Sequence, residues 1–147
     1  MRKGFNVFSR QMNWARRKRE PDHLKLGRWG EKQAENFLRK QGVKILGRRV
    51  RVGKHDELDL LAREENLLVV IEVKTRSKEG MRPAKDAVDK EKQIRLNRAA
   101  LAYARKLTPR PEGIRFDIVE VIGKLGEKRP EIRHHPGAFG LHHGFRY

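Results

Sequence analysis

The sequence contains no cysteine. This absence excludes disulfide bonds, thiolate zinc sites and cysteine nucleophiles, and it fits a reducing compartment, so we expect a cytoplasmic protein. Long apolar runs are also missing, because no segment approaches the ~20 apolar residues that a helix needs to span a bilayer. Hydrophobic residues make up 37% of the chain, which is enough for a modest core.

Acidic residues are scarce beside basic ones. The 147 residues include 36 Lys and Arg but only 19 Asp and Glu, so the formal charge is +17. A net charge of this size opposes compaction, and a polyanionic partner is the simplest explanation for it. Nucleic acid, with DNA preferred, is the first candidate and an anionic membrane surface is the second. Charge alone does not separate an enzyme from a basic structural protein.

The basic residues begin at the N-terminus, where the first 19 residues carry seven Lys or Arg and no acid. This stretch lacks the apolar centre of a secretory signal. We expect residues 1–22 to form a basic flexible arm, residues 23–123 to form one nuclease-like α/β domain, and residues 124–147 to form a basic tail rich in Gly and His. Attachment to an anionic membrane through the arm stays open as an alternative.

Hydrophobic periodicity predicts the elements of the domain. The predicted elements are a helix over 24–41, a strand over 43–52 interrupted near Gly47, strands over 57–62 and 67–75, a long helix over 84–107 and a strand over 114–122. The order α-β-β-β-α-β predicts an α/β fold with a central mixed sheet flanked by helices. A polar turn separates the second and third strands, which predicts an antiparallel hairpin. The unbroken apolar run at 67–71 predicts that the third strand is central.

Glu72 and Lys74 follow that apolar run directly and share one face of the strand, because side chains alternate across a strand. Glu57 and Asp59 also share a face, and tight pairing of the hairpin would place Asp59 beside Glu72. Two carboxylates suit Mg²⁺ or Mn²⁺, which lowers the pKa of a bound water, and a neighbouring lysine can orient that water or stabilise a phosphate. The alternative is a set of ion pairs where a buried strand meets solvent.

The segments GRWGEKQAENFL, ELDLLA, VVIEVKTR, VDKEKQIRLNRAALAYA and IRFDIVEV, taken in order over residues 24–122, resemble the YraN-like family of small bacterial proteins. That family belongs to the restriction-endonuclease-like superfamily, whose signature is an acid, a spacer and (D/E)xK. The resemblance implies that Asp59 and Glu72 are the two acids, that Lys74 is the lysine, and that the carbonyl of Val73 completes the metal site. It also matches Glu31 to an acid that reaches the same site in related nucleases, although the helix dipole alone explains an acid there.

The sequence departs from the family at one position. Asp56 stands where the family usually has Gly before Glu-x-Asp, and a third carboxylate would alter metal affinity or mark a tolerant turn. The resemblance places Lys92 and Gln93 on the side that faces the substrate. The basic residues expected to contact phosphates are Arg48, Arg49, Arg51, Arg76, Lys90 and Lys92.

We therefore expect a metal-dependent endonuclease that hydrolyses DNA phosphodiesters, with branched or damaged DNA in repair or recombination as candidate substrates. The alternative is a non-catalytic protein on the same fold that binds DNA or RNA, including a ribosome-associated role. The tail also holds His134, His135, His142 and His143. These residues would suit Zn²⁺ or Ni²⁺, but composition is their only signal, and a tail folded back on the domain is simpler.

Overall fold

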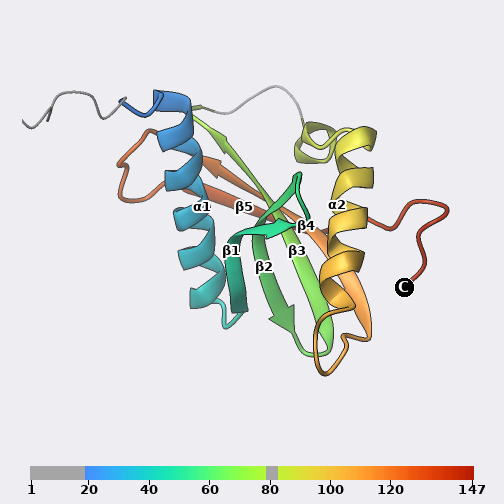
Figure 1. Cartoon of the computed structure of the whole chain (residues 1–147). Helices are drawn as coiled ribbons and strands as arrows, with labels where there is room; N and C mark the ends of the chain where they lie inside the picture. The colour runs from blue at the N-terminus through green and yellow to red at the C-terminus, as the bar shows by residue number, and fades with distance from the viewer. Residues whose placement is uncertain (1–18, 79–82) are drawn as a thin grey trace, which may run out of the picture.

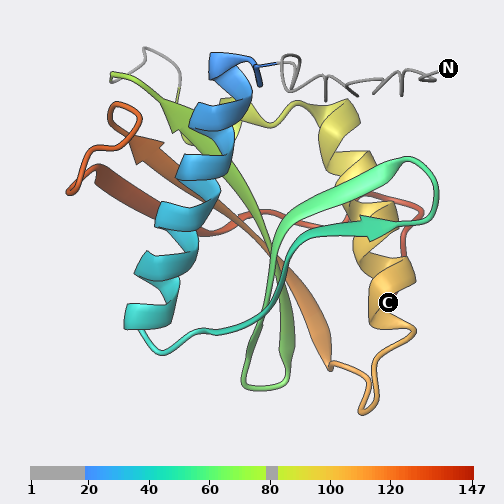
Figure 2. The same ribbon diagram turned by 60° about the vertical axis from the view of Figure 1, so that its left-hand side comes forward.

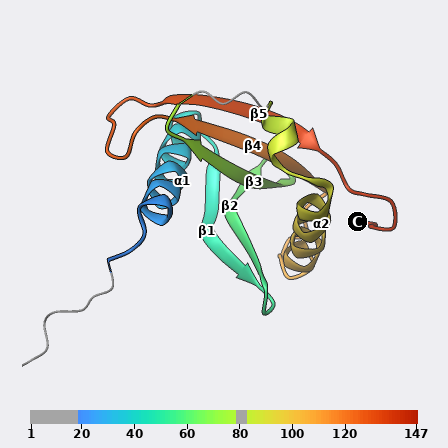
Figure 3. The same ribbon diagram turned by 90° about the horizontal axis from the view of Figure 1, so that it is seen from above.

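A five-stranded sheet with one helix on each face makes up the chain in the computed structural model, which describes residues 19–78 and 83–147 (Figures 1 and 3). Most of the expected arm, residues 1–18, lies outside the described residues. The elements are α1 (Asp22–Lys40), β1 (Lys44–Val52), β2 (Asp56–Glu64), β3 (Leu67–Arg76), the 3₁₀ helix η1 (Ala84–Ala87), α2 (Lys90–Ala104), β4 (Gly113–Ile122) and β5 (Glu131–Phe139). Neither α1 nor α2 is long and apolar enough to cross a membrane.

The strands lie in the order β1-β2-β3-β4-β5. β3 and β4 are parallel and the other three neighbouring pairs are antiparallel, so the mixed sheet, the hairpin and the central position of β3 are confirmed. The apolar run of β3 is unbroken because both faces are covered. Val69 and Ile71 pack in the cluster that includes Ala34 of α1, whereas Leu68 and Val70 pack with α2.

The second predicted helix, over 84–107, is corrected. The chain forms η1, becomes extended at Val88, and starts α2 only at Lys90. The cause is Asp89, whose carboxylate accepts a hydrogen bond of 2.7 Å from the amide of Lys92 and so caps a new helix start. The restart places Lys92 in the first turn of α2, from which its side chain reaches Glu72 on β3.

The segment 124–147, expected to be a tail, contributes a fifth strand to the sheet. β5 pairs with β4, and the buried carboxylate of Asp117 on β4 helps to hold it by accepting hydrogen bonds from the His134 ring and the Gly137 amide. The chain then crosses α2, where the fully buried Asn97 binds the carbonyl of Gly140 and the amide of His142. Residues 131–142 are therefore part of the domain.

The β1–β2 hairpin extends beyond the sheet, and its tip lies over α2 (Figure 2). Arg98 of α2 fastens the tip through hydrogen bonds of 2.9–3.1 Å to both carboxylate oxygens of Asp56. Asp56, the residue that departs from the family pattern, thus has a structural partner on α2.

Candidate active site

The backbone pairing between β2 and β3 ends just before Asp59. Leu60 pairs with Ile71 in the last register position, so Asp59 falls across from Glu72 just where the two strands separate. The Asp59 carboxylate takes the place of the missing backbone contact, because its Oδ2 accepts a hydrogen bond of 2.9 Å from the amide of Val73. Asp59 and Glu72 therefore lie just beyond the last register position, and the charge of Glu72 contributes to raising the pKa of Asp59.

The strand on the other side of Asp59 is also irregular. Arg48 pairs with Leu60 and Val50 with Leu58, which leaves Arg49 across from Asp59. Arg49 has a φ of 53°, in the left-handed region that residues other than glycine rarely adopt. Unusual backbone conformations of this kind gather at functional sites, where the surrounding structure holds them.

Glu72 is buried, with 3% of its surface exposed, and its two oxygens differ. Oε1 lies 3.1 Å from Nζ of Lys74 and 2.7 Å from Nζ of Lys92. Oε2 has no hydrogen-bond partner among the described residues. A buried carboxylate oxygen without a partner carries a desolvation cost of a few kcal/mol, so an electropositive group placed there would relieve it.

Electrostatics distinguish Asp59 from an ordinary surface acid. Burial, reinforced by the charge of Glu72, raises the pKa of Asp59 to about 7, against the opposing effect of the Val73 hydrogen bond. Burial also works against the charge of Lys92, but Glu72 outweighs it, so the pKa of Lys92 is raised. The site therefore holds Asp59, whose charged form is disfavoured by burial, beside Glu72, which is paired with two ammonium groups.

Glu31 reaches the neighbourhood from α1. Its side chain is 13% exposed, and burial raises its pKa, while the nearby Arg49 opposes that shift. Nε of Arg49 lies 3.9 Å from Oε2 of Glu31. Glu31 does not complete a ligand set with Asp59 and Glu72, since the described part of the chain holds no group of three or more His, Cys, Asp or Glu side chains placed to bind one ion.

The residues expected to contact nucleic acid fall into separate places. Arg48, Arg49 and Arg51 line one pocket with Glu31 and Glu57. Arg76 lies on β3 at 3.9 Å from Glu120, and Lys90 is exposed at the start of α2. The amide of the Gln93 side chain is used within the protein, because it donates to the carbonyl of Val88 and its oxygen lies 2.8 Å from the His142 ring.

Two histidines of the supposed tail have partners that the sequence did not reveal. His134 lies 2.8 Å from Asp117 and His135 lies 2.9 Å from Glu120, so each contacts a different carboxylate on β4. The two histidines therefore act in joining β5 to β4. The signal for this arrangement is the pair of acids in FDIVE, which stand among residues that otherwise suit a buried strand.

The donor set of Asp59 and Glu72 fits a divalent cation. Hard carboxylate oxygens are what Mg²⁺ and Mn²⁺ bind, and the two groups lie across from one another at the end of a ladder. Oε2 of Glu72 has no partner among the described residues, and burial together with the charge of Glu72 raises the pKa of Asp59, so a cation bound between the two carboxylates would stabilise their charged forms. With two protein carboxylates, such an ion would keep several water ligands, as Mg²⁺ usually does.

Comparison with known sequences assigns the chain to a family. The model of the uncharacterised protein family UPF0102 matches residues 30–121. A UPF0102 protein of Syntrophotalea carbinolica is 42% identical over 120 residues, covering 80% of this chain and 94% of the relative. One from Bacteroides thetaiotaomicron is 44% identical over 108 residues, covering 74% and 88%. The chain therefore belongs to the UPF0102 family, the YraN-like family that its sequence motifs resemble.

Proposed function

We propose that this protein is a metal-dependent endonuclease that hydrolyses phosphodiester bonds of DNA, with branched or damaged DNA in repair or recombination as its substrate and the cytoplasm as its place of action. The observation that carries the proposal is the convergence of Asp59, Glu72 and Lys74 where β2 and β3 separate, with a buried oxygen of Glu72 left unpartnered among the described residues. The charge of +17 supplies the affinity for a polyanion.

Each residue has a role that its position supports. Asp59 and Glu72 would hold Mg²⁺ or Mn²⁺, with the carbonyl of Val73 as a third ligand. Such an ion supplies positive charge for the phosphate and a bound water of lowered pKa. Lys74, whose side chain is 27% exposed and lies 3.1 Å from Glu72, would orient the water or offset charge on the phosphate. Glu31 would help from the side of α1.

A second function, binding of DNA or RNA without cleavage, is favoured by one contact. Lys74 and Lys92 both approach Oε1 of Glu72, so two ammonium groups already neutralise much of the negative charge at the site. In a binding protein the same residues would be a buried ion network, and no metal would be required.

The test compares cleavage and binding in the same samples. Wild type, Asp59→Asn and Lys74→Ala are incubated with duplex, single-stranded, flapped and four-way DNA and with RNA, in Mg²⁺, Mn²⁺ or chelator. Glu65→Gln is the matched control, because Glu65 is an exposed acid in the turn at the other end of the β2–β3 hairpin. We expect wild type and the control to cut one class of DNA in the presence of metal, and both site variants to bind it without cutting.

Binding of nucleic acid that none of the variants changes, with no product from any substrate, would reject the endonuclease and favour the binding protein. Cleavage that survives both Asp59→Asn and Lys74→Ala would instead place the chemistry elsewhere in the molecule or in a contaminant.

A further inference from the structure

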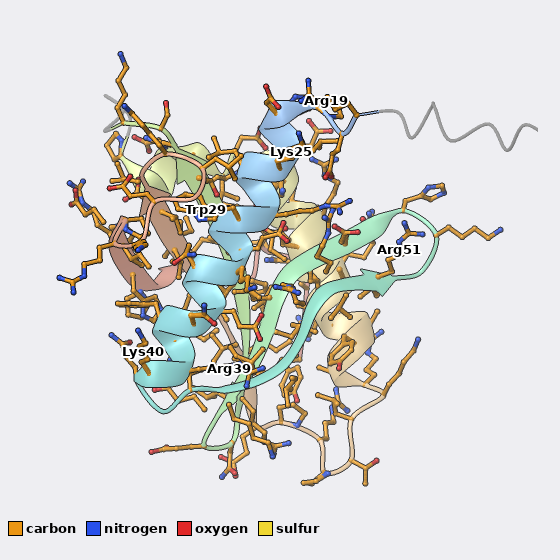
Figure 4. The ribbon with its side chains drawn as sticks, turned by 90° about the vertical axis from the view of Figure 1, so that its left-hand side faces the viewer. Arg19, Lys25, Trp29, Arg39, Lys40 and Arg51 are labelled. Atoms are coloured by element: carbon orange, nitrogen blue, oxygen red, sulfur yellow. The ribbon has the colours of Figure 1, made fainter. Side chains whose placement is uncertain are left out.

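A groove runs between α1 and β1, on the side of the molecule drawn in Figure 4. Its volume is about 670 Å³. Arg28 and Lys32 line it from α1, while Arg48, Arg49 and Arg51 line it from β1. Only Arg48, Arg49 and Arg51 are among the residues expected from the sequence to contact phosphates, so α1 adds two cations that the sequence analysis did not single out.

Charge in the groove favours an anion. Five cationic side chains face two acids, Glu31 and Glu57. The left-handed Arg49 lies between those acids, with its Nε 3.2 Å from Glu57 and 3.9 Å from Glu31, so it offsets the charges that would otherwise repel a phosphate. Arg48 and Arg51 remain accessible, with 44% and 86% of their side chains exposed.

The residues that line the groove lie next to the candidate active site. Glu57 stands two positions before Asp59 on β2, and Arg49 lies across from Asp59 in the neighbouring strand. A chain of phosphates lying along Arg51 and Arg48 would therefore pass beside Asp59. The charge of Glu31, on the opposite wall, also contributes to raising the pKa of Asp59.

The volume of the groove suits a single strand of nucleic acid. Pockets of about 300–1,000 Å³ hold a drug-sized molecule, and a nucleotide is of that size, so about 670 Å³ accommodates one or two nucleotides. The two walls are also linked across the groove by the ion pair between Arg49 and Glu31, at 3.9 Å.

We propose that this groove binds a single-stranded segment of nucleic acid through its phosphates and guides it to Asp59 and Glu72. The inference rests on the proposed function, because it names the substrate class of the same site: a strand that is unpaired where it enters. Recognition is independent of base sequence. Trp29, the aromatic residue of the lining, points to the other side of α1 from Arg51 in Figure 4, and its ring lies near Gly123.

Binding in chelator tests the groove without requiring cleavage. The full-length protein is titrated with a labelled single strand and with a blunt duplex of equal length, at several salt concentrations. The groove variant is Arg48→Gln/Arg51→Gln, in which both side chains are exposed and their ion pairs, at 3.4 and 3.9 Å, contribute little to stability. The control is Lys128→Gln/Arg129→Gln, which removes the same charge from an exposed loop between β4 and β5. Thermal melts establish that both variants are folded.

We expect the groove variant to bind the single strand about tenfold more weakly than the control does, and to bind the duplex as the control does. Each lost phosphate contact on a single strand lowers the salt slope by about 0.7, so two lost contacts lower it by about 1.4 relative to the control. Equal losses in the two variants on the single strand, or equal losses on single strand and duplex in the groove variant, would overturn the inference.

The two proposals fail separately. If wild type cuts DNA but the groove variant binds like the control, the endonuclease stands and the groove is not the entrance. If the groove variant selectively loses the single strand but no DNA is ever cut, the groove remains a binding site and the endonuclease is rejected.

Discussion

Gly30 of α1 lies against Thr75 of β3 so closely that no side chain fits between them. A Cβ on Gly30 would overlap Oγ1, Cβ and Cγ2 of Thr75. This approach sets the distance from α1 to the centre of the sheet, and Glu31 is the next residue of the helix. Gly30 thus positions an acid beside the candidate active site, which explains why a helix tolerates glycine in its interior.

Gly30→Ala is expected to lower the free energy of unfolding by about 1–2 kcal/mol. Overpacking costs about 1–3 kcal/mol, and the better helix propensity of alanine recovers less than 1 kcal/mol of it. Chemical denaturation measures the change. Gly27→Ala is the control in the same helix, because a Cβ there meets nothing within 4 Å, so this variant should be slightly more stable than wild type. Equal effects of the two substitutions would contradict the close packing.

Asp59→Asn is expected to stabilise the metal-free protein above pH 7 by on the order of 2–4 kcal/mol. The folded-state pKa of Asp59 is raised to about 7, so wild type loses stability as pH rises from about 4 to about 7. The asparagine keeps an acceptor for the Val73 amide and carries no charge. The gain should vanish near pH 4, which denaturation curves at several pH values would measure.

Added Mg²⁺ or Mn²⁺ should raise the melting temperature of wild type and leave that of Asp59→Asn almost unchanged, because a ligand stabilises only the fold that binds it. This measurement needs no activity. Identical shifts in the two proteins would mean that the ion acts elsewhere, for instance by general screening.

Asp117→Asn should change the pH dependence of the free energy of unfolding in the opposite direction from Asp59→Asn. Burial works to raise the pKa of Asp117, but hydrogen bonds from His134, Arg115 and the Gly137 amide outweigh it and lower the pKa to about 2. A lowered pKa means that the stability contributed by this carboxylate is present above pH 4 and is lost between about pH 4 and 2, by about 2 kcal/mol. The variant should lack this loss, whereas Asp86→Asn, at an exposed position in η1, should retain it.

Asn97→Ala is expected to release the chain that follows β5. The substitution leaves the carbonyl of Gly140 and the amide of His142 without their partner on α2, at a cost of about 2–3 kcal/mol. Hydrogen exchange at residues 140–143 should become faster than in Ile94→Ala, a control on the same helix whose side chain is 36% exposed. Unchanged protection there would show that this segment is held by other contacts.

Local sequence patterns predicted the parts of the fold that local chemistry determines. The apolar run before Glu72, and the polar turn that precedes this run, predicted a central strand in a hairpin. Pairing of that hairpin then brought Asp59 across from Glu72. The start of α2 was missed although Asp89 is a helix-capping residue, because the periodicity continued through it.

Other features depend on partners that are distant in the sequence. β5 shows little apolar alternation, since its histidines are matched to Asp117 and Glu120 on another strand. The left-handed Arg49 has no signature of its own in the sequence, because arginine does not favour that conformation and the acids that pair with it, Glu31 and Glu57, lie on other elements.

The β1–β2 hairpin is attached to both helices, to α2 by Arg98–Asp56 and to α1 by Arg49–Glu31. Both ion pairs reach solvent, so dissolved salt weakens them as well as competing for phosphates, whereas the buried Val52 and Leu58 still pack in the cluster that includes α2. We therefore expect ionic strength to affect the positions of the side chains that line the groove, in addition to screening its charge. A plot of the logarithm of affinity against the logarithm of salt concentration should bend downward where these ion pairs weaken, and a rigid basic surface would give a straight line.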